Sequence, residues 1–416
     1  MSARRILYVA SHWPGAPPYG AQQRVLQIGR LLQKLGDLSL VLVTMDTDGE
    51  RWRQQTEAEF KIARVINVRP VSRGGISGRL RHEFDPGYLQ TVPFAADPND
   101  RRAVLALLEQ HDTAWVHTIK TANLLGIDRW PYSVIDIDDL PSRFYQSAAQ
   151  TNGSLARRLL DRRMSAIWKR RERRLADRFT LLMVCSEDDR HYLGMDRVRV
   201  LPNGFEPVFA AERHPVEPPR IGFIGTFRWT PNVESVQWFC REVWPLIKRD
   251  MPDVQLRVVG EGTETAANWA DGVEGLGRVI DSGREIATWS AMVVPIRVGG
   301  GTRIKVLEAF ARRCPVVATT VGAFGYNLHD GEELFLADQP NTFASRCVAL
   351  IRSPHLAEPM VHRARRRFLE SWTWESYADV VQDAVEEVSA WRSSPQAARA
   401  MERRLRRCRL HREPDM

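Results

Sequence analysis

The fold is decided by residues 5–44, which read RILYVASHWPGAPPYGAQQRVLQIGRLLQKLGDLSLVLVT. The apolar runs at 5–10 and 38–44 are typical of strands buried in a parallel sheet. Between them lie a loop rich in Pro and Gly, residues 11–20, and a helix that Gly36 is placed to end. The helix is predicted by apolar residues at helical spacing, namely Val25, Ile28, Leu31, Leu32 and Leu35. Strand, loop, helix and strand make a βαβ unit, so the sequence predicts an α/β fold.

The same rhythm of strands and helices restarts once along the chain, and its second run includes a short strand predicted at Val279 and Ile280. Residues 205–218 are rich in proline and lack apolar periodicity, which indicates a linker between a domain at 1–204 and a second α/β domain at 219–371. A Trp-rich helix at 372–392 is expected to pack back towards the first domain, and residues 393–416 form a basic tail. Two such domains place a cleft between the carboxyl ends of two parallel sheets, where open α/β folds bind their ligands.

The composition excludes several classes of protein. Of the 416 residues, 44% are hydrophobic and 26% are charged, which excludes wholesale disorder. No apolar run is long enough to cross a bilayer, and the N-terminus MSARRILYVA turns polar at once, so we expect no signal peptide. The five scattered cysteines fit reduced thiols in a cytoplasm and neither a disulfide framework nor a zinc site. Lys and Arg number 59 against 51 Asp and Glu, and this excess of +8 favours anionic partners.

The most informative stretch is residues 298–309, VGGGTRIKVLEA. Its three glycines let the backbone approach a ligand closely. A helix opens directly after them, so the free N–H groups around Thr302 and Ile304 face the predicted cleft and form an anion site. The alternative interpretation is a flexible loop before a surface helix.

Three charged side chains strengthen this interpretation. Arg303 and Lys305 place two cations beside the anion site. Glu308 lies about a turn and a half into the helix, where it could accept hydrogen bonds from a ribose. Together they indicate a site for a nucleotide.

At this point the sequence resembles the large retaining family of nucleotide-sugar glycosyltransferases, family four, which has the GT-B fold. The resemblance covers nearly the whole chain and is closest to a bacterial branch involved in polysaccharide or lipid-linked glycan assembly. Residues 299–319 resemble the family's nucleotide-diphosphate segment, and 330–333 its DGEN-type loop. Residues 201–205 are similar to its inter-domain PNG turn, 18–24 to its first Gly-rich loop, and 115–117 to the strand that ends in a histidine.

The resemblance implies a fold, a reaction and a set of site residues. It implies two Rossmann-like doubly wound domains facing across a cleft, the first binding the acceptor and the second the nucleotide sugar. Transfer would proceed with retention, with no cofactor beyond the nucleoside-diphosphate sugar and no obligatory metal. The predicted catalytic residues are His117, which the resemblance implies, and Arg303 and Lys305, whose role is a hypothesis explained below. The donor-binding residues that it implies are Gly20, Arg228, Gly260, Gly262, Arg278, Val279, Gly300, Gly301, Thr302, Ile304 and Glu308.

The sequence departs from the family pattern at four positions. The first glutamate of the family's pair falls on Gly300, and the Arg and Lys that follow the first strand of the second domain fall on Thr226 and Asn232. Phe324 stands where this branch often carries an acid. We expect these changes to affect which sugar is used more than the type of reaction.

A pyrophosphate still needs positive charge in the transition state. Our hypothesis is that Arg303 and Lys305, together with Arg228, supply it from the other side of the pocket.

Several charged segments keep two interpretations. Asp136, Asp138 and Asp139 could form a metal cluster, but solvated acids at a strand end are the simpler interpretation, with Asp138 or Asp139 near the acceptor as a further option. A long helix is expected from Leu155 to Phe179, with Leu155, Leu159 and Ile167 on its apolar stripe. Its residues 157–178 carry ten Lys and Arg against three acids, and it could lie on anionic lipid or present a solvated face packed on the core. The tail at 399–412 could be an arm that binds a membrane surface or a frayed end. No nucleic-acid recognition module is visible. We expect a cytoplasmic protein that could also be peripheral at the inner face of the plasma membrane.

Three functions remain in view. The leading one is a glycosyltransferase with a nucleotide-sugar donor and a glycan or lipid-linked acceptor. A nucleotide-sugar 2-epimerase would turn over the donor without an acceptor. A non-catalytic glycosyltransferase-like scaffold is the third, motivated by Gly300, Thr226 and Asn232.

Overall fold

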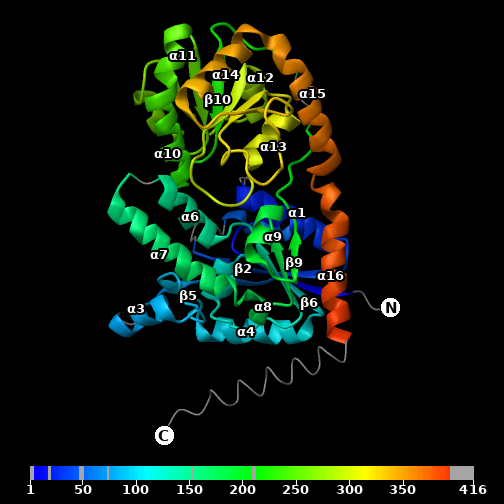
Figure 1. Cartoon of the computed structure of the whole chain (residues 1–416). Coiled ribbons are helices and arrows are strands. Elements are labelled where there is room, and N and C mark those ends of the chain that lie inside the picture. Colours follow the sequence, from blue (N-terminus) through cyan, green and yellow to red (C-terminus); the bar gives the residue numbers. More distant parts are fainter. Residues whose placement is uncertain are drawn as a thin grey trace.

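The computed structural model describes residues 4–16, 20–45, 51–72, 75–151, 153–208 and 212–393. The chain forms two α/β halves stacked end to end, each built around a parallel sheet (Figure 1). This confirms the predicted α/β fold. The basic tail, apart from its first residue, lies outside the described residues.

The first half holds a seven-stranded parallel sheet. Its strands, in spatial order, are β3 Ile62–Asn67, β2 Asp37–Thr44, β1 Arg5–Ala10, β6 Thr113–His117, β7 Ser133–Ile137, β8 Leu181–Val184 and β9 Val198–Val200. Its helices are α1 Gly20–Gln33, α2 Arg53–Glu57, α3 Gly75–Phe84, α4 Pro98–Gln110, α5 Ile119–Leu124, α6 Pro141–Thr151, α7 Leu155–Glu172, α8 Leu175–Arg178 and α9 Glu187–Leu193. A short antiparallel pair, β4 Arg69–Pro70 and β5 Phe94–Ala95, lies apart from the sheet. Strand β1 is buried from Ile6 onward because helices cover both faces of the sheet.

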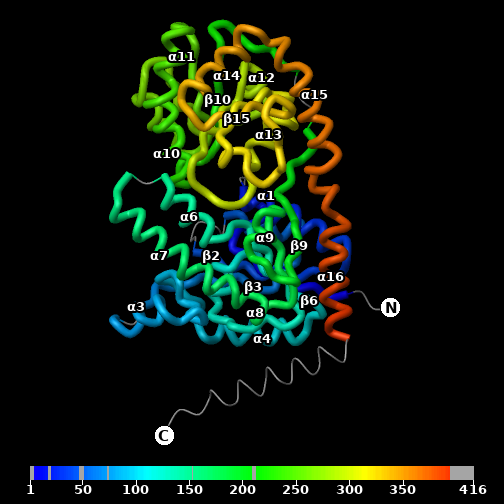
Figure 2. The backbone as a smooth tube through the Cα atoms, viewed as in Figure 1, coloured from blue at the N-terminus to red at the C-terminus, as the bar shows by residue number. Residues whose placement is uncertain are grey.

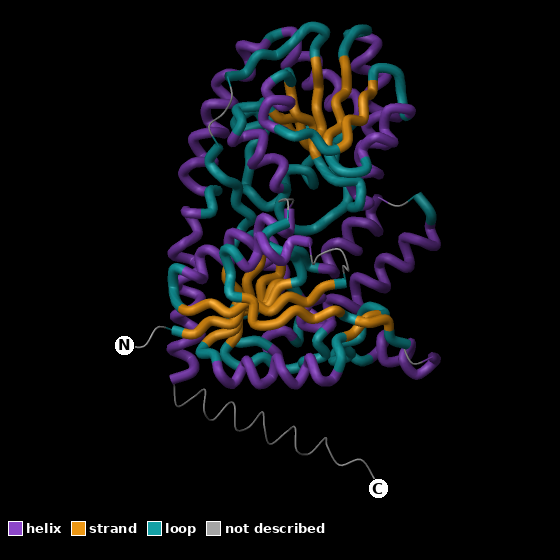
Figure 3. Tube along the Cα trace, turned by 180° about the vertical axis from the view of Figure 1, so that it is seen from behind, coloured by secondary structure: helices purple, strands orange, loops and turns teal. Residues whose placement is uncertain are grey.

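The second half holds a six-stranded parallel sheet (Figure 3). Its strands, in spatial order, are β12 Val273–Gly277, β11 Gln255–Val259, β10 Arg220–Ile224, β13 Ala291–Val294, β14 Val316–Ala318 and β15 Phe335–Leu336. Its helices are α10 Thr230–Trp238, α11 Trp244–Asp250, α12 Ser282–Ala287, α13 Ile304–Ala311, α14 Pro340–Arg352 and α15 Pro354–Ser371. A π-helical turn, Phe239–Val243, joins α10 to α11, and 3-10 turns lie at Thr263–Asn268 and Glu375–Tyr377.

The last two helices run along one side of both halves (Figures 1 and 2). Helix α15 packs on α13 and α14, and α16, Ala378–Ser393, contacts α1, β6 and β7 of the first half. Phe205 and Thr373 pair in a parallel bridge, so the chain crosses between the halves twice at one place.

The strand orders determine where a ligand can bind. The order of the first sheet reverses between β1 and β6, and that of the second between β10 and β13. In open α/β sheets the crevice beyond the carboxyl ends of the strands at such a reversal is the usual ligand site.

Two sequence predictions about individual elements were wrong. Val279 and Ile280 were expected in a strand, but β12 ends at Gly277 and Ile280 lies exposed in the loop that follows. Leu155 and Leu159 were expected on a buried stripe, but both are exposed. The reason is that the first turns of α7 project beyond the sheet together with α6, while Ile167 further along is buried (Figure 1). None of the described helices combines the length and the apolar character needed to cross a membrane.

Candidate active site

The two reversal points face each other across the boundary between the halves. Asn203, in the turn that leaves the first half, donates from Nδ2 to Asp138 Oδ1 at 3.0 Å and to Thr302 Oγ1 at 2.9 Å. The backbone N–H of Gly299 donates to Ser147 Oγ on α6 at 3.3 Å. The loop between β13 and α13 therefore touches the carboxyl edge of the first sheet.

Lys305 reaches the end of β10 from the first turn of α13. Its Nζ lies 2.8 Å from Asn232 Oδ1 and 4.0 Å from the centre of the Phe223 ring. A Cβ at Gly225, the residue after β10, would lie 3.0 Å from the same Nζ. Burial, and next the charge of Arg303, hold the pKa of Lys305 well below its usual value. Position 232 is where the sequence resemblance expected a lysine, so an ammonium from α13 lies beside the residue that lacks one.

Arg303 is buried beside the glycine loop. Its Nη1 donates to the carbonyl of Gly300 at 2.6 Å, and its guanidinium lies 5.5 Å from the centre of the Trp229 ring. The Nε and Nη2 atoms are buried and have no partner among the described residues. Burial lowers the pKa of this arginine, and the charge of Asp139 opposes that effect. Buried donors without partners are costly, so this side chain is suited to an anion that would accept from them.

Glu308, the residue predicted to bind the ribose, contacts other side chains of the protein. Glu308 accepts a hydrogen bond from Ser282 Oγ at 3.0 Å and pairs with Arg312 at 3.1 Å. It lies near Lys305, whose pKa its charge raises. Thr302 is buried against Asn203, and Ile304 begins α13.

The two arginines predicted near the nucleotide share one acid. Arg228 pairs with Glu261 at 2.6 Å and Arg278 with the same carboxylate at 2.9 Å. Arg228 is largely exposed, and its role in neutralising the pyrophosphate stays a prediction. Val279 is half-buried beside Arg278.

The predicted glycines lie at loop and helix boundaries. Gly260 and Gly262 flank Glu261 and take positive φ values of 136° and 80°. Gly20 begins α1, and a Cβ there would meet open space. The two residues that precede it in the predicted Gly-rich loop lie outside the described residues.

His117 ends β6 at the reversal point of the first sheet. It is fully buried, and neither ring nitrogen has a partner among the described residues. The ring of His12, two residues after β1, meets it edge-on at 6.1 Å. Burial lowers the pKa of both imidazoles, that of His12 to about 4, with the charge of His117 as a second cause. Two neutral imidazoles therefore line this corner. His12 was not predicted as a site residue, although it lies just beyond the end of β1 as His117 lies at the end of the neighbouring β6.

Asp139 leaves little room for a side chain at position 300, where the family carries a glutamate and this chain has Gly300. A Cβ at Gly300 would lie 2.7 Å from Asp139 Oδ1, and a Cβ at Gly301 equally close. Asp139 comes from the first half and faces solvent, but the surrounding protein desolvates it and raises the pKa of its carboxyl to about 7. A carboxylate from the first half thus occupies the space beside the glycine loop.

Asp136 is neither a metal ligand nor a solvated acid, which corrects both interpretations of the sequence. It pairs with Arg24 at 2.5 Å, and both side chains are fully buried. Arg24 also donates to the carbonyls of Leu201 and Pro202 and to Asn203 Oδ1, at 3.0, 3.3 and 3.1 Å. This pair fixes the turn that carries Asn203 into the cleft.

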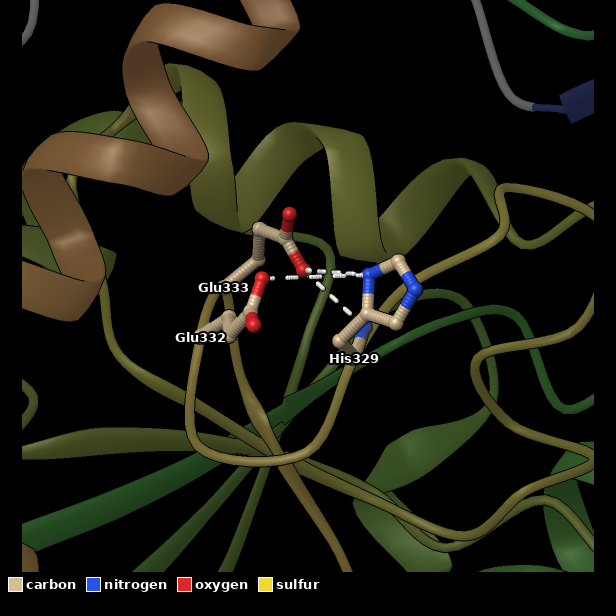
Figure 4. A group of neighbouring side chains, drawn as sticks. All are labelled: His329, Glu332 and Glu333. Carbon is tan, nitrogen blue, oxygen red and sulfur yellow. Dashed lines mark hydrogen bonds and ion pairs between the residues drawn. The ribbon is translucent and has the colours of Figure 1, made fainter.

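One further group of side chains could offer ligands to a metal ion. His329, Glu332 and Glu333 gather in the loop before β15 (Figure 4). Glu333 pairs with Arg367 on α15 and accepts from the backbone N–H of His329 at 3.0 Å. Its charge is therefore already balanced within the protein, and the contacts hold the DGEE loop against α15.

Comparisons with known proteins bear on the fold and on the segment that carries the glycine loop. Residues 218–353 match the family described as Glycosyl transferases group 1. The phosphatidyl-myo-inositol mannosyltransferase of Mycobacterium leprae (strain TN) is 31% identical over 193 residues, covering 43% of this chain and 50% of that protein. The match therefore spans half the length of that relative.

Solved structures match over almost the whole chain. Sucrose-phosphate synthase from Thermosynechococcus elongatus has a TM-score of 0.64 at 16% identity, covering 93% of this chain and 99% of its own. HepE of Anabaena in complex with UDP-glucose has a TM-score of 0.59 at 14% identity, covering 92% of this chain and 99% of its own. The protein has the two-domain GT-B fold of glycosyltransferases. Within that fold, its second half carries the group 1 segment.

Proposed function

We propose that this protein is a retaining glycosyltransferase that uses a nucleoside-diphosphate sugar. The observation that carries the proposal is a pair of cations, the half-buried Lys305 and the buried Arg303, at the reversal point of the second sheet. They lie in the segment that matches the group 1 family, and the buried His117 lies at the reversal point of the opposite sheet.

Each group has a proposed task. Lys305 and Arg303 hold the β-phosphate, and Glu308 turns from Ser282 to the ribose. The base lies beside Gly260, Gly262 and the loop that follows β12. His117 and His12 offer neutral donors and acceptors to hydroxyls of the donor sugar or the acceptor.

The proposed reaction exchanges one bond at the anomeric carbon for another. The acceptor hydroxyl oxygen attacks that carbon on the face that the nucleotide leaves, and the bond to the β-phosphate oxygen breaks. The departing phosphate takes the hydroxyl proton, so the products are a glycoside with retained configuration and a nucleoside diphosphate. The protein contributes position and positive charge, and we propose no obligatory metal.

The acceptor is proposed to be a hydroxyl of a glycan, a lipid-linked glycan or a polysaccharide. The mannosyltransferase relative supports sugar transfer, and the UDP-glucose bound to HepE supports a nucleotide-sugar donor.

We also propose a cytoplasmic enzyme that associates with the inner membrane face. Ile76, Leu80 and Phe84 make an exposed apolar stripe along α3, with exposed fractions of 78%, 54% and 68%. Arg163 of the basic helix α7 pairs with Glu83 of α3 at 2.7 Å, so the stripe and the basic face belong to one surface. Apolar side chains bordered by arginines suit an anionic bilayer, and sedimentation with phosphatidylglycerol vesicles but not with pure phosphatidylcholine vesicles tests this.

The function is tested by incubating the protein with UDP-, GDP-, ADP- and dTDP-sugars and a mixture of candidate glycan acceptors. We expect one nucleoside diphosphate to be released in step with a glycoside whose anomeric configuration, read by NMR, equals that of the donor. Inverted product would refute retention. Conversion of the donor to its C2 epimer without acceptor would identify an epimerase instead, and no turnover despite donor binding would favour a scaffold.

A further inference from the structure

A basic pocket opens between α6 and α7, outside the donor site. Its volume is about 550 Å³, within the range of roughly 300–1,000 Å³ that ligand sites usually have. Arg158, Arg162 and Lys169 of α7 line it together with Gln146 of α6 and Tyr192 of α9. None of its lining residues is acidic.

Two of the three cations of the pocket have no ion pair among the described residues. Neither Arg158 nor Arg162 is paired with a carboxylate of the described chain, and the Nε of Arg158 is buried without a partner. Lys169 Nζ lies over the Tyr192 ring at 4.6 Å, a contact that leaves its N–H donors for another group. Three cations on one face of a helix, with an orphaned buried donor among them, suit a phosphate or diphosphate.

Exposed leucines border these cations. Leu155 and Leu159 precede Arg158 and Arg162 by three residues each, so they are neighbours on the helix surface. Their exposed fractions are 68% and 56%. An apolar chain that leaves the phosphate would meet them first.

The pocket also borders the donor site. Ser147, the neighbour of Gln146, accepts the hydrogen bond from Gly299 of the glycine loop at 3.3 Å. Arg143 lies between the Tyr192 ring and the Phe324 ring of the second half, 5.3 and 4.8 Å from their centres.

We infer that the α6–α7 pocket binds the phosphate group of a lipid-phosphate-linked acceptor, with Arg158, Arg162 and Lys169 on the phosphate and Leu155 and Leu159 on the lipid chain. Its role as an acceptor site rests on the proposed function. The glycan at the other end of such an acceptor would extend past Ser147 towards the glycine loop.

The test uses farnesyl diphosphate as a soluble probe and the full chain. We expect it to bind, and the double variant R158Q/R162Q to bind it at least tenfold more weakly. The matched control R101Q/R102Q removes the same charge from exposed positions of α4 and should bind as the parent does. Farnesol should not bind. The double variant L155S/L159S should bind farnesyl diphosphate more weakly than the parent but bind inorganic pyrophosphate with unchanged affinity.

Nucleotide binding on the same variants separates this inference from the proposed function. R158Q/R162Q should bind nucleoside diphosphates as the parent does. K305M should lose nucleoside-diphosphate binding and keep its binding of farnesyl diphosphate. Equal affinity of R158Q/R162Q and R101Q/R102Q for farnesyl diphosphate would overturn the inference. An equal loss of affinity for farnesyl diphosphate in R158Q/R162Q and in K305M would overturn it as well. Equal binding of pyrophosphate and farnesyl diphosphate would overturn the lipid part.

Discussion

Removing the charge of Lys305 tests whether the cation has moved from position 232 to α13. In Lys305→Met the side chain keeps its length and loses the ammonium that lies 2.8 Å from Asn232 Oδ1. A hydrogen bond to a charged group contributes roughly 1.5–3 kcal/mol, which corresponds to a roughly 10- to 150-fold change in a dissociation constant. We therefore expect the best-bound diphosphate among UDP, GDP, ADP and dTDP to bind more weakly by that factor in isothermal titration calorimetry.

The exchange variant Lys305→Met/Asn232→Lys makes the test specific. A lysine at 232 would extend into the space that Lys305 leaves, because Nζ and Asn232 are in direct contact. We expect it to recover most of the lost affinity. Lys61→Met, an exposed lysine of the first half, is the control for charge alone. Unchanged affinity in Lys305→Met, or an exchange variant no better than the single one, would refute the reasoning.

Three further predictions concern the reaction, its proton balance and stability. His117→Ala removes a buried imidazole from the first sheet while the donor contacts of α13 stay in place, so kcat should fall roughly 10²-fold with the donor KM nearly unchanged; a change in KM alone would place this residue elsewhere. Burial depresses the pKa of Lys305 in the free protein and a bound diphosphate raises it, so binding should take up a proton and weaken as pH rises between the two pKa values. Calorimetry in buffers of different ionisation enthalpy measures this uptake, and identical enthalpies would contradict it. Arg24→Met leaves Asp136 buried without its partner, so the free energy of unfolding should fall by about 3–5 kcal/mol in a denaturant titration, and by less in Arg24→Met/Asp136→Leu; a loss below 1 kcal/mol (roughly the value of an exposed pair) would refute a buried structural pair.

The sequence predicts the fold well because the central strands of both sheets are buried on both faces. Continuous apolar runs such as 5–10 and 38–44 therefore stand out. The strand expected at Val279 and Ile280 fails because two apolar residues say nothing about burial, and Ile280 is in fact exposed.

The site is only partly predictable for a different reason. Lys305 and Arg303 are found because they lie within one short segment. The contact of Lys305 with Asn232 and that of Gly300 with Asp139 join residues from distant segments, and only the tertiary structure brings them together. The burial of Asp136 depends in the same way on Arg24, 112 residues earlier in the chain.

We propose above that the cleft binds a nucleoside diphosphate through the cations of α13. The most direct measurement is the melting temperature of the protein with UDP, GDP, ADP or dTDP, with magnesium or with EDTA, in parent and Lys305→Met. A ligand that binds only the folded state raises the melting temperature by mass action. The account predicts a rise with one diphosphate that persists in EDTA and shrinks in Lys305→Met. No rise with any of the four, from folded protein, would contradict it.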